Sequence, residues 1–132
     1  MSTDLRLALP NRPGMVTAAC DVLAAAGIAV EGVCGDLRPG ERWGYLHFLV
    51  ADGEVARGAL EHAGFEVAAA HDVEILPVAD GDGMVETLAR YKEADRNVEV
   101  LYSTLDGDMV VGTEDMRRER PGVKVKDARY WT

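Results

Sequence analysis

The sequence predicts an α+β fold in which two copies of a β-α-β-β-α-β unit each form an antiparallel sheet backed by helices. Short β-prone runs alternate along the chain with stretches of helical apolar spacing. The chain also repeats itself, because Gly-Met-Val occurs at 14–16 and again at 83–85, 69 positions later (83 minus 14). Val-Glu occurs at 30–31 and at 98–99, 68 positions apart (98 minus 30), and this near-constant offset indicates an internal duplication.

The first copy is expected over residues 1–70. Leucines at alternate positions from 5 to 9 are typical of a half-buried strand. Pro13 suits the first turn of a helix, and Gly27 suits its end. The elements expected are strands near 5–9, 28–33, 43–50 and 64–69, and helices over 13–26 and 54–63.

The second, more divergent copy is expected over residues 71–132. The loop Ala-Asp-Gly-Asp-Gly replaces Pro-Asn-Arg-Pro-Gly of the first copy, and Asp106-Gly107 is a tight hairpin signal. The elements expected are strands over 72–78, 97–103, 108–112 and 122–125, a helix over 84–93 and a short charged helix over 114–120.

Composition excludes several classes of partner. The chain has 132 residues, 48% of them hydrophobic, and a formal net charge of -9 at pH 7. That proportion of hydrophobic residues is enough for a core, and a negative surface repels nucleic acid and anionic lipid. No apolar run approaches the roughly 18 residues of a membrane span. We therefore expect a cytoplasmic protein that binds neither nucleic acid nor membrane.

Neither a metal site nor a cofactor site is expected. Two cysteines, Cys20 and Cys34, are too few for a zinc cluster or a disulfide framework. The three histidines are scattered over a strand, a helix end and a linker, so they form no ligand pair. The acidic loop before Gly83 lacks the spacing of a calcium loop.

One stretch carries a resemblance to a known family. The segment PNRPGMVTAACDVLAAAGIAVEGV resembles the hallmark of ACT domains, which are amino-acid-sensing regulatory modules of ferredoxin-like fold. That hallmark is an Asp or Asn, then Arg-Pro-Gly, a helix ending in Ala-Gly, and then Ile-Asn-Ile-Glu. The match covers about the first 70 residues well and the second half loosely, so the chain resembles stand-alone tandem ACT proteins.

The resemblance implies an amino-acid ligand at the seam between the two modules. Unpaired N–H groups and the helix dipole at the start of the first helix favour a carboxylate there. The far wall would come from the start of the second strand, where Glu31 could pair with an amino group. The ligand-binding residues implied in the first copy are Asn11, Arg12, Pro13, Gly14, Met15, Val16, Val30, Glu31 and Gly32.

The second copy departs from the pattern at the corresponding positions. Asp80 and Asp82 lie at the expected helix start, where their charge would occupy the dipole and discourage a carboxylate. Asn97 restores the asparagine that the family often has in the second strand. The hypothesis is therefore two unequal sites, the second formed by Asp80, Asp82, Gly83, Met84, Asn97 and Glu99.

We expect a non-catalytic sensor that regulates amino-acid metabolism, as a homodimer with a possible partner enzyme. No nucleophile-base motif and no phosphate-binding glycine loop occurs in the sequence. Two alternatives stay open. One is a protein-protein interaction module without a ligand, and the other is an acylphosphatase-like enzyme that would use Arg12 and Asn97.

Overall fold

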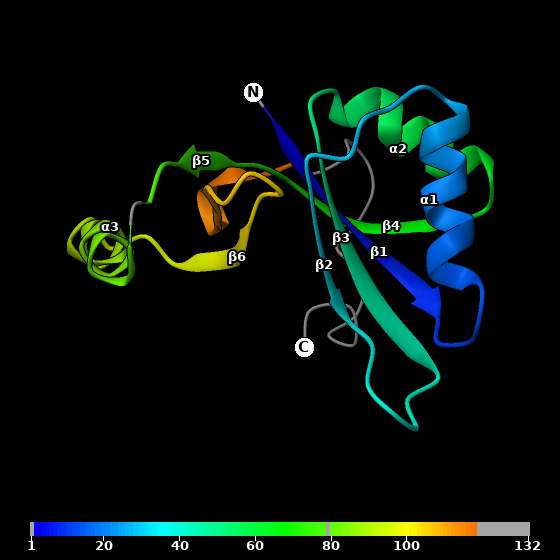
Figure 1. Cartoon of the computed structure of the whole chain (residues 1–132), viewed down its shortest axis with the longest axis horizontal. Helices are drawn as coiled ribbons and strands as arrows, with labels where there is room; N and C mark the ends of the chain where they lie inside the picture. The colour runs from blue at the N-terminus through cyan, green and yellow to red at the C-terminus, as the bar shows by residue number, and fades with distance from the viewer. Residues whose placement is uncertain (1, 79, 119–132) are drawn as a thin grey trace.

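The α+β fold is confirmed by the computed structural model, which describes residues 2–78 and 80–118 (Figure 1). The first unit consists of β1 (Thr3–Pro10), α1 (Met15–Ala25), β2 (Gly32–Asp36), β3 (Trp43–Val50), α2 (Gly53–His62) and β4 (Glu66–Asp72). The second unit consists of β5 (Glu74–Leu76), α3 (Gly81–Glu93), β6 (Val98–Ser103), β7 (Met109–Thr113), a 3-10 turn (Glu114–Met116) and β8 (Arg117–Arg118).

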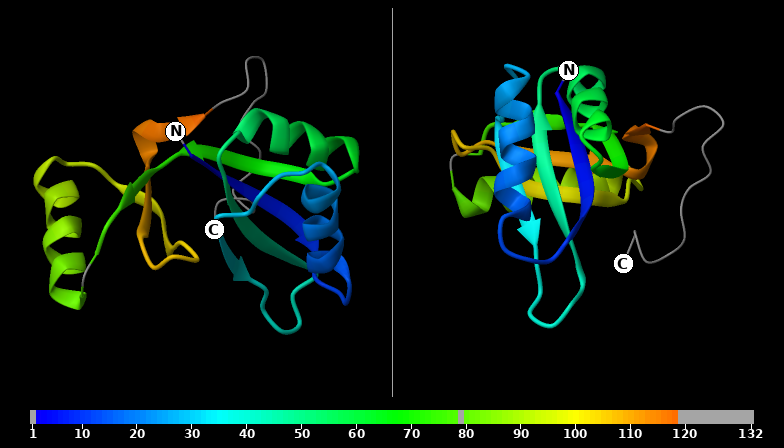
Figure 2. Two further views of the ribbon diagram at one scale, coloured as in Figure 1. Left: turned by 45° about the horizontal axis from the view of Figure 1, so that its top comes forward. Right: turned by 90° about the vertical axis from the view of Figure 1, so that its right-hand side faces the viewer.

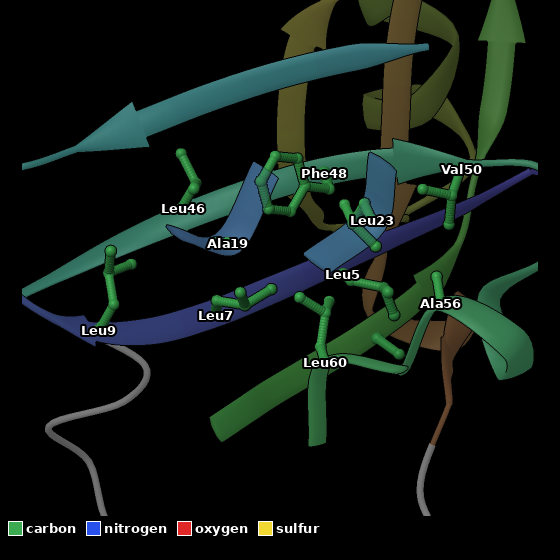
Figure 3. Close-up of a cluster of buried hydrophobic side chains, with 11 residues drawn as sticks. Leu5, Leu7, Leu9, Ala19, Leu23, Leu46, Phe48, Val50, Ala56 and Leu60 are labelled. Atoms are coloured by element: carbon green, nitrogen blue, oxygen red, sulfur yellow. The ribbon is translucent and has the colours of Figure 1, made fainter. Parts of the chain in front are cut away.

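The first sheet has the strand order β2-β3-β1-β4-β8, and all its described pairs are antiparallel. Its first four strands with α1 and α2 form the split β-α-β arrangement predicted for the first copy. The alternate leucines of β1 are fully buried and face both helices, as Figure 3 shows. The members of this core include Leu5, Leu7, Leu9, Ala19, Leu23, Phe48, Ala56 and Leu60.

The second sheet has the order β5-β7-β6 and carries α3. Tyr91 of α3 packs with Met109 and Val111 of β7 to form its small core. The second unit lies on the side of the first sheet that α1 and α2 leave uncovered (Figures 1 and 2). Leu49 of β3 and Val110 of β7 are both buried in one cluster, so apolar contacts join the two sheets.

The expected helix over 114–120 is wrong for the residues that the structure describes. Glu114–Met116 form one 3-10 turn, and Arg117–Arg118 then form β8 against β4. Arg118 donates hydrogen bonds to Asp72 and Glu54, both at 3.0 Å. These ion pairs favour an extended chain beside β4 over a further helical turn, and the strand expected over 122–125 lies outside the described residues.

The chain changes sheet at Val73, between the end of β4 at Asp72 and the start of β5 at Glu74. Since β8 returns to the first sheet, the two units are interleaved at their junction. The division into modules at residues 70 and 71 stays a prediction. None of the described helices is long and apolar enough to cross a membrane.

Candidate functional site

The predicted turn between β1 and α1 is open. Arg12, Pro13 and Gly14 are exposed, and Gly14 takes the left-handed conformation (φ 88°) that favours glycine. No side chain caps the first turn of α1, and that turn holds no acidic residue. By contrast, Asp52 caps α2 and Asp80 caps α3. The start of α1 is thus the one uncapped helix start among the described α-helices.

Asn11 has a structural role at this turn. Its side-chain Nδ2 donates to the carbonyl oxygens of Arg38 at 2.8 Å and Glu41 at 3.0 Å, and its backbone N–H donates to Arg42 at 2.8 Å. Asn11 therefore anchors the loop between β2 and β3 with both of its amide hydrogens. Met15 and Val16, the first two residues of α1, are half-buried against the core of the first unit.

The structure does not bring the two predicted walls of the first site together. Pro10 pairs with Trp43, whereas Gly32 pairs with Leu49, six residues further along β3 (49 minus 43). That separation corresponds to about 20 Å along an extended strand. β2 begins at Gly32, later than the strand expected over 28–33, so Val30 and Glu31 precede it.

The predicted far wall instead contacts the second unit. The Glu31 carbonyl accepts a hydrogen bond from the Leu105 N–H at 3.0 Å, and Gly32 forms a bridge with Thr104. A Cβ at Gly32 would lie 3.4 Å from Thr104 and from Tyr102, so glycine permits the close approach. These positions contact the second unit, at the end of the first sheet remote from Asn11.

At the second predicted site, the acidic residues occupy the start of α3 as expected. Asp80 Oδ1 accepts a hydrogen bond from the Gly83 N–H at 2.8 Å, and Asp82 lies in the first turn. A pocket of about 320 Å³ adjoins them, lined by Val78, Asp80, Gly81, Met84, Leu101, Tyr102, Ser103, Gly107, Asp108 and Met109. Among the described residues, the lining of this pocket includes acidic side chains and no basic one.

Asn97 and Glu99 lie away from that pocket. The Asn97 carbonyl accepts a hydrogen bond from the Glu114 N–H at 3.1 Å. Asn97 directly precedes β6 of the second sheet, whereas Arg12 follows the far end of β1 in the first sheet (Figure 1). The two residues of the acylphosphatase-like alternative are therefore not brought together.

The strongest concentration of functional groups lies where β6 meets the open face of the first sheet. Arg6 of β1 stands opposite His47 of β3 and Ala69 of β4, so the three side chains share that face. Together with the next residues on β4 and β6 they line a cavity of about 230 Å³, which we call the junction pocket. Its lining is Arg6, His47, Ala69, His71, Glu99 and Val100.

A fully buried carboxylate joins the sheets beside this pocket. Asp4 accepts a hydrogen bond from the Tyr102 hydroxyl at 2.5 Å, and its Oδ2 lies 2.9 Å from His47 Nδ1. Burial, together with the nearby Asp4 carboxylate, raises the pKa of Tyr102, so the phenol stays protonated and donates. Asp4 belongs to β1 and Tyr102 to β6, so this bond spans the seam.

A second ion pair spans the seam on the other side of the pocket. Glu99 of β6 accepts hydrogen bonds from His71 Nε2 at 2.9 Å and from the Arg117 guanidinium. Burial alone would raise the pKa of Glu99, but the hydrogen bonds from Arg117 and His71 outweigh it and hold the pKa below its ordinary value. Glu99 is therefore an ionised acceptor in the pocket wall.

Two buried nitrogens at the junction pocket have no hydrogen-bond partner among the described residues, Arg6 Nε and His71 Nδ1. His71 is only 3% exposed, and burial lowers the pKa of Arg6. The Arg6 guanidinium lies 4.0 Å from the centroid of the Tyr45 ring, which supports it without neutralising it. A buried donor or acceptor without a partner is costly, so each of these nitrogens would gain from a further hydrogen-bond partner.

Sequence reasoning missed this pocket except for Glu99. One signal was present, because Asp4 and Arg6 place opposite charges between the buried leucines of β1. His47 and His71 lie far apart in the chain, and only the pairing of β1 with both β3 and β4 brings them to one cavity.

Comparison with known proteins shows the fold. The chain matches no protein-family model and no curated protein sequence. It is similar to a solved protein from Bacteroides thetaiotaomicron, with a TM-score of 0.71, 23% identity, and coverage of 86% of this chain and 80% of that one. It is also similar to the regulatory subunits of aspartate kinase from Thermus thermophilus (TM-score 0.62) and Thermus flavus (TM-score 0.59), each 19% identical over 85% of this chain and 82% of that one.

Proposed function

We propose that this chain is a non-catalytic regulatory module that binds a free amino acid or a similar small anion in the junction pocket. The observation that carries the proposal is the pair of unpartnered buried nitrogens, Arg6 Nε and His71 Nδ1, at one cavity between the sheets. The fold shared with the aspartate kinase regulatory subunits supports a regulatory role.

The chemistry of the pocket favours a small carboxylate. A guanidinium is the side chain best suited to a planar carboxylate, and no described carboxylate accepts a hydrogen bond from Arg6 Nε. The volume of about 230 Å³ lies below the roughly 300–1,000 Å³ of pockets for drug-sized ligands.

Regulation would follow from the position of the pocket. Its walls come from both sheets, so a ligand that contacts both stabilises their present packing over any other arrangement. Only that difference in affinity between arrangements can transmit a signal to a partner enzyme of amino-acid metabolism.

The homodimer is proposed through β2. This strand is an outer strand of the first sheet. Beyond the bridge from Gly32 to Thr104, no described strand pairs with its outer edge, so that edge can pair with another strand. Val33, Leu37 and Trp43, on β2 and beside it, are 44%, 39% and 54% exposed. An extended sheet formed by two copies would cover them, and light scattering on the purified chain distinguishes a dimer from a monomer.

The proposal is tested by a thermal-shift screen of the twenty amino acids on the wild type, Arg6→Met and the control Arg12→Met. A ligand at ten times its Kd adds about 1.4 kcal/mol to the free energy of unfolding, enough to move the midpoint by several degrees. We expect a shift in the wild type and in Arg12→Met, but not in Arg6→Met.

Two other outcomes contradict the proposal. Loss of the shift in Arg12→Met alone would place the ligand at the open start of α1. No shift with any amino acid at millimolar concentration would favour an interaction module without a ligand.

A further inference from the structure

We infer that the tip of the hairpin between β6 and β7, residues 104–108, is an interaction surface for a second copy of this chain. It receives the loop between β2 and β3, residues 37–42, of that copy. The inference rests on the homodimer proposed through β2 and does not depend on amino-acid binding. It goes beyond that homodimer, because it brings the second unit of each copy into the interface.

The hairpin tip lies at one end of the outer edge of β2. Gly32 forms a bridge with Thr104, and the Leu105 N–H donates a hydrogen bond to the Glu31 carbonyl at 3.0 Å. Residues 33–36 of β2 have no described strand on their outer side. A strand from another molecule can therefore pair with this segment, and it meets the hairpin tip where the segment begins.

Two-fold symmetry decides which segments meet. An isologous dimer uses the same strand from both copies, and antiparallel pairing of residues 33–36 places residue 36 of one copy opposite residue 33 of the other. The next residue of the second copy, Leu37, then arrives beside Gly32, where Thr104 and Leu105 already lie. The loop between β2 and β3 projects beyond the end of its own sheet, so the loop of each copy runs along the hairpin tip of the other (Figure 1).

The residues that meet are apolar and exposed in the single chain. Leu105 is 72% exposed, the highest value among the large apolar side chains that the structure describes as exposed. Leu37 is 39% exposed. Contact between Leu105 of one copy and Leu37 of the other removes both side chains from water, and two-fold symmetry forms this contact twice.

The charges beside these two leucines are opposite in sign. Asp106 follows Leu105 and is exposed, and Arg38 follows Leu37 with a side chain that is 72% exposed. Arg38 forms an ion pair with Asp36 at 3.1 Å, but an exposed ion pair of this kind is weak, so Arg38 can turn to Asp106 of the other copy. The hairpin tip holds two acidic residues, Asp106 and Asp108, and no basic one, whereas the loop holds two arginines, Arg38 and Arg42, and one acidic residue, Glu41.

Local charge pairing matters here because the copies repel one another as a whole. Each chain has a formal net charge of -9 at pH 7. Opposite charges at one place on the surface offset that repulsion locally and fix the orientation in which two copies meet. Since the second unit of each copy would contact the first unit of the other, any change in the packing of the two units would change the affinity of the dimer.

The first test removes the apolar contact. The dissociation constant of the dimer is measured by sedimentation equilibrium for the wild type, Leu105→Ser and the control Val55→Ser. Val55 is 54% exposed on α2 and lies on neither of the two surfaces. We expect the dissociation constant to rise at least about tenfold in Leu105→Ser and to change by less than about twofold in Val55→Ser.

The second test exchanges the two charges. Arg38→Asp and Asp106→Lys should each weaken the dimer at low ionic strength, because each places like charges side by side. Asp106→Lys also lowers the negative charge of the chain, which by itself favours association, so a weaker dimer in this variant reports the local contact. The double variant restores a pair of opposite charges and should bind within about threefold of the wild type.

The outcomes separate this inference from the proposed homodimer. Recovery of the dimer in the double variant excludes misfolding as the cause of the weaker binding. A dimer that Leu105→Ser weakens no more than Val55→Ser, or a double variant no tighter than the single ones, would overturn the hairpin contact while the dimer through β2 stands. A wild-type chain that stays monomeric at every concentration would overturn both.

Discussion

Removal of one hydroxyl group from the seam provides a quantitative test of how the two sheets are held together. Tyr102→Phe deletes the donor that reaches the fully buried Asp4 carboxylate at 2.5 Å. The ring stays in place and continues to pack against Leu49, so the substitution isolates the hydrogen bond.

The magnitude follows from the charge of the acceptor. A hydrogen bond to a charged group contributes about 1.5–3 kcal/mol, more than a neutral one. Its loss leaves Asp4 with His47 as its one hydrogen-bond partner among the described side chains. We expect the free energy of unfolding to fall by about 2 kcal/mol or more. Urea denaturation followed by circular dichroism measures this, with Ser103→Ala on an exposed position of the same strand as the matched control.

Alkaline pH gives the same prediction a second readout. The pKa of Tyr102 is raised in the folded state above the ordinary 10.0. A raised pKa means that this contribution to stability is fully present below pH 10 and is lost as the pH rises beyond it, because only the unfolded state then releases the proton. The difference between wild type and Tyr102→Phe should shrink above pH 10. A cost below about 0.5 kcal/mol at pH 7, equal to that of the control, would refute the reasoning.

Three further predictions concern the first unit. Gly58→Ala on the exposed side of α2 should raise the free energy of unfolding by about 0.4–1 kcal/mol, because the added methyl group meets no neighbour there. Gly53→Ala should lower the free energy of unfolding, because a Cβ at Gly53 would lie 2.6 Å from Thr3. Chemical denaturation measures both variants, and equal effects would contradict this prediction. Thr17→Asp places a negative charge in the uncapped first turn of α1, where the helix dipole favours it, and should stabilise the fold by about 0.3–1 kcal/mol relative to Thr17→Asn. Amino-acid binding should not weaken in this variant, and weaker binding would favour the start of α1 as the ligand site. Asn11→Ala should speed hydrogen exchange in the loop between β2 and β3, because the Asn11 side chain donates two hydrogen bonds to that loop. The thermal shift caused by amino acids should persist in this variant, and its loss would count against binding at the junction pocket.

The sequence was most informative where a local pattern decides the structure. The alternate leucines of β1 face one core because strand side chains alternate, and Gly14 ends the turn into α1 because it adopts a left-handed conformation. Both features follow from residues close together in the chain. The acidic start of α3 was also predicted, since Asp80 caps the helix that it precedes.

The junction pocket could not be predicted in the same way. Arg6, His71 and Glu99 meet only because β1 pairs with β4 and because β6 packs on the open face of the first sheet. The separation of Asn11 from Gly32 likewise depends on strand register, which the sequence of either segment leaves open. The expected helix after Thr113 was wrong because Arg117 and Arg118 find carboxylate partners on other strands.

The most direct test of amino-acid binding between the two sheets is a ¹H–¹⁵N spectrum of the arginine Nε–H groups, recorded while the chain is titrated with each of the twenty amino acids. Arg6 Nε is buried without a partner at the pocket, and exposed Arg12 serves as the control within the same molecule. We expect the Arg6 resonance to move and saturate with at least one amino acid while that of Arg12 stays in place. Movement of Arg12 with Arg6 unchanged, or no movement of either, would contradict binding at the junction pocket.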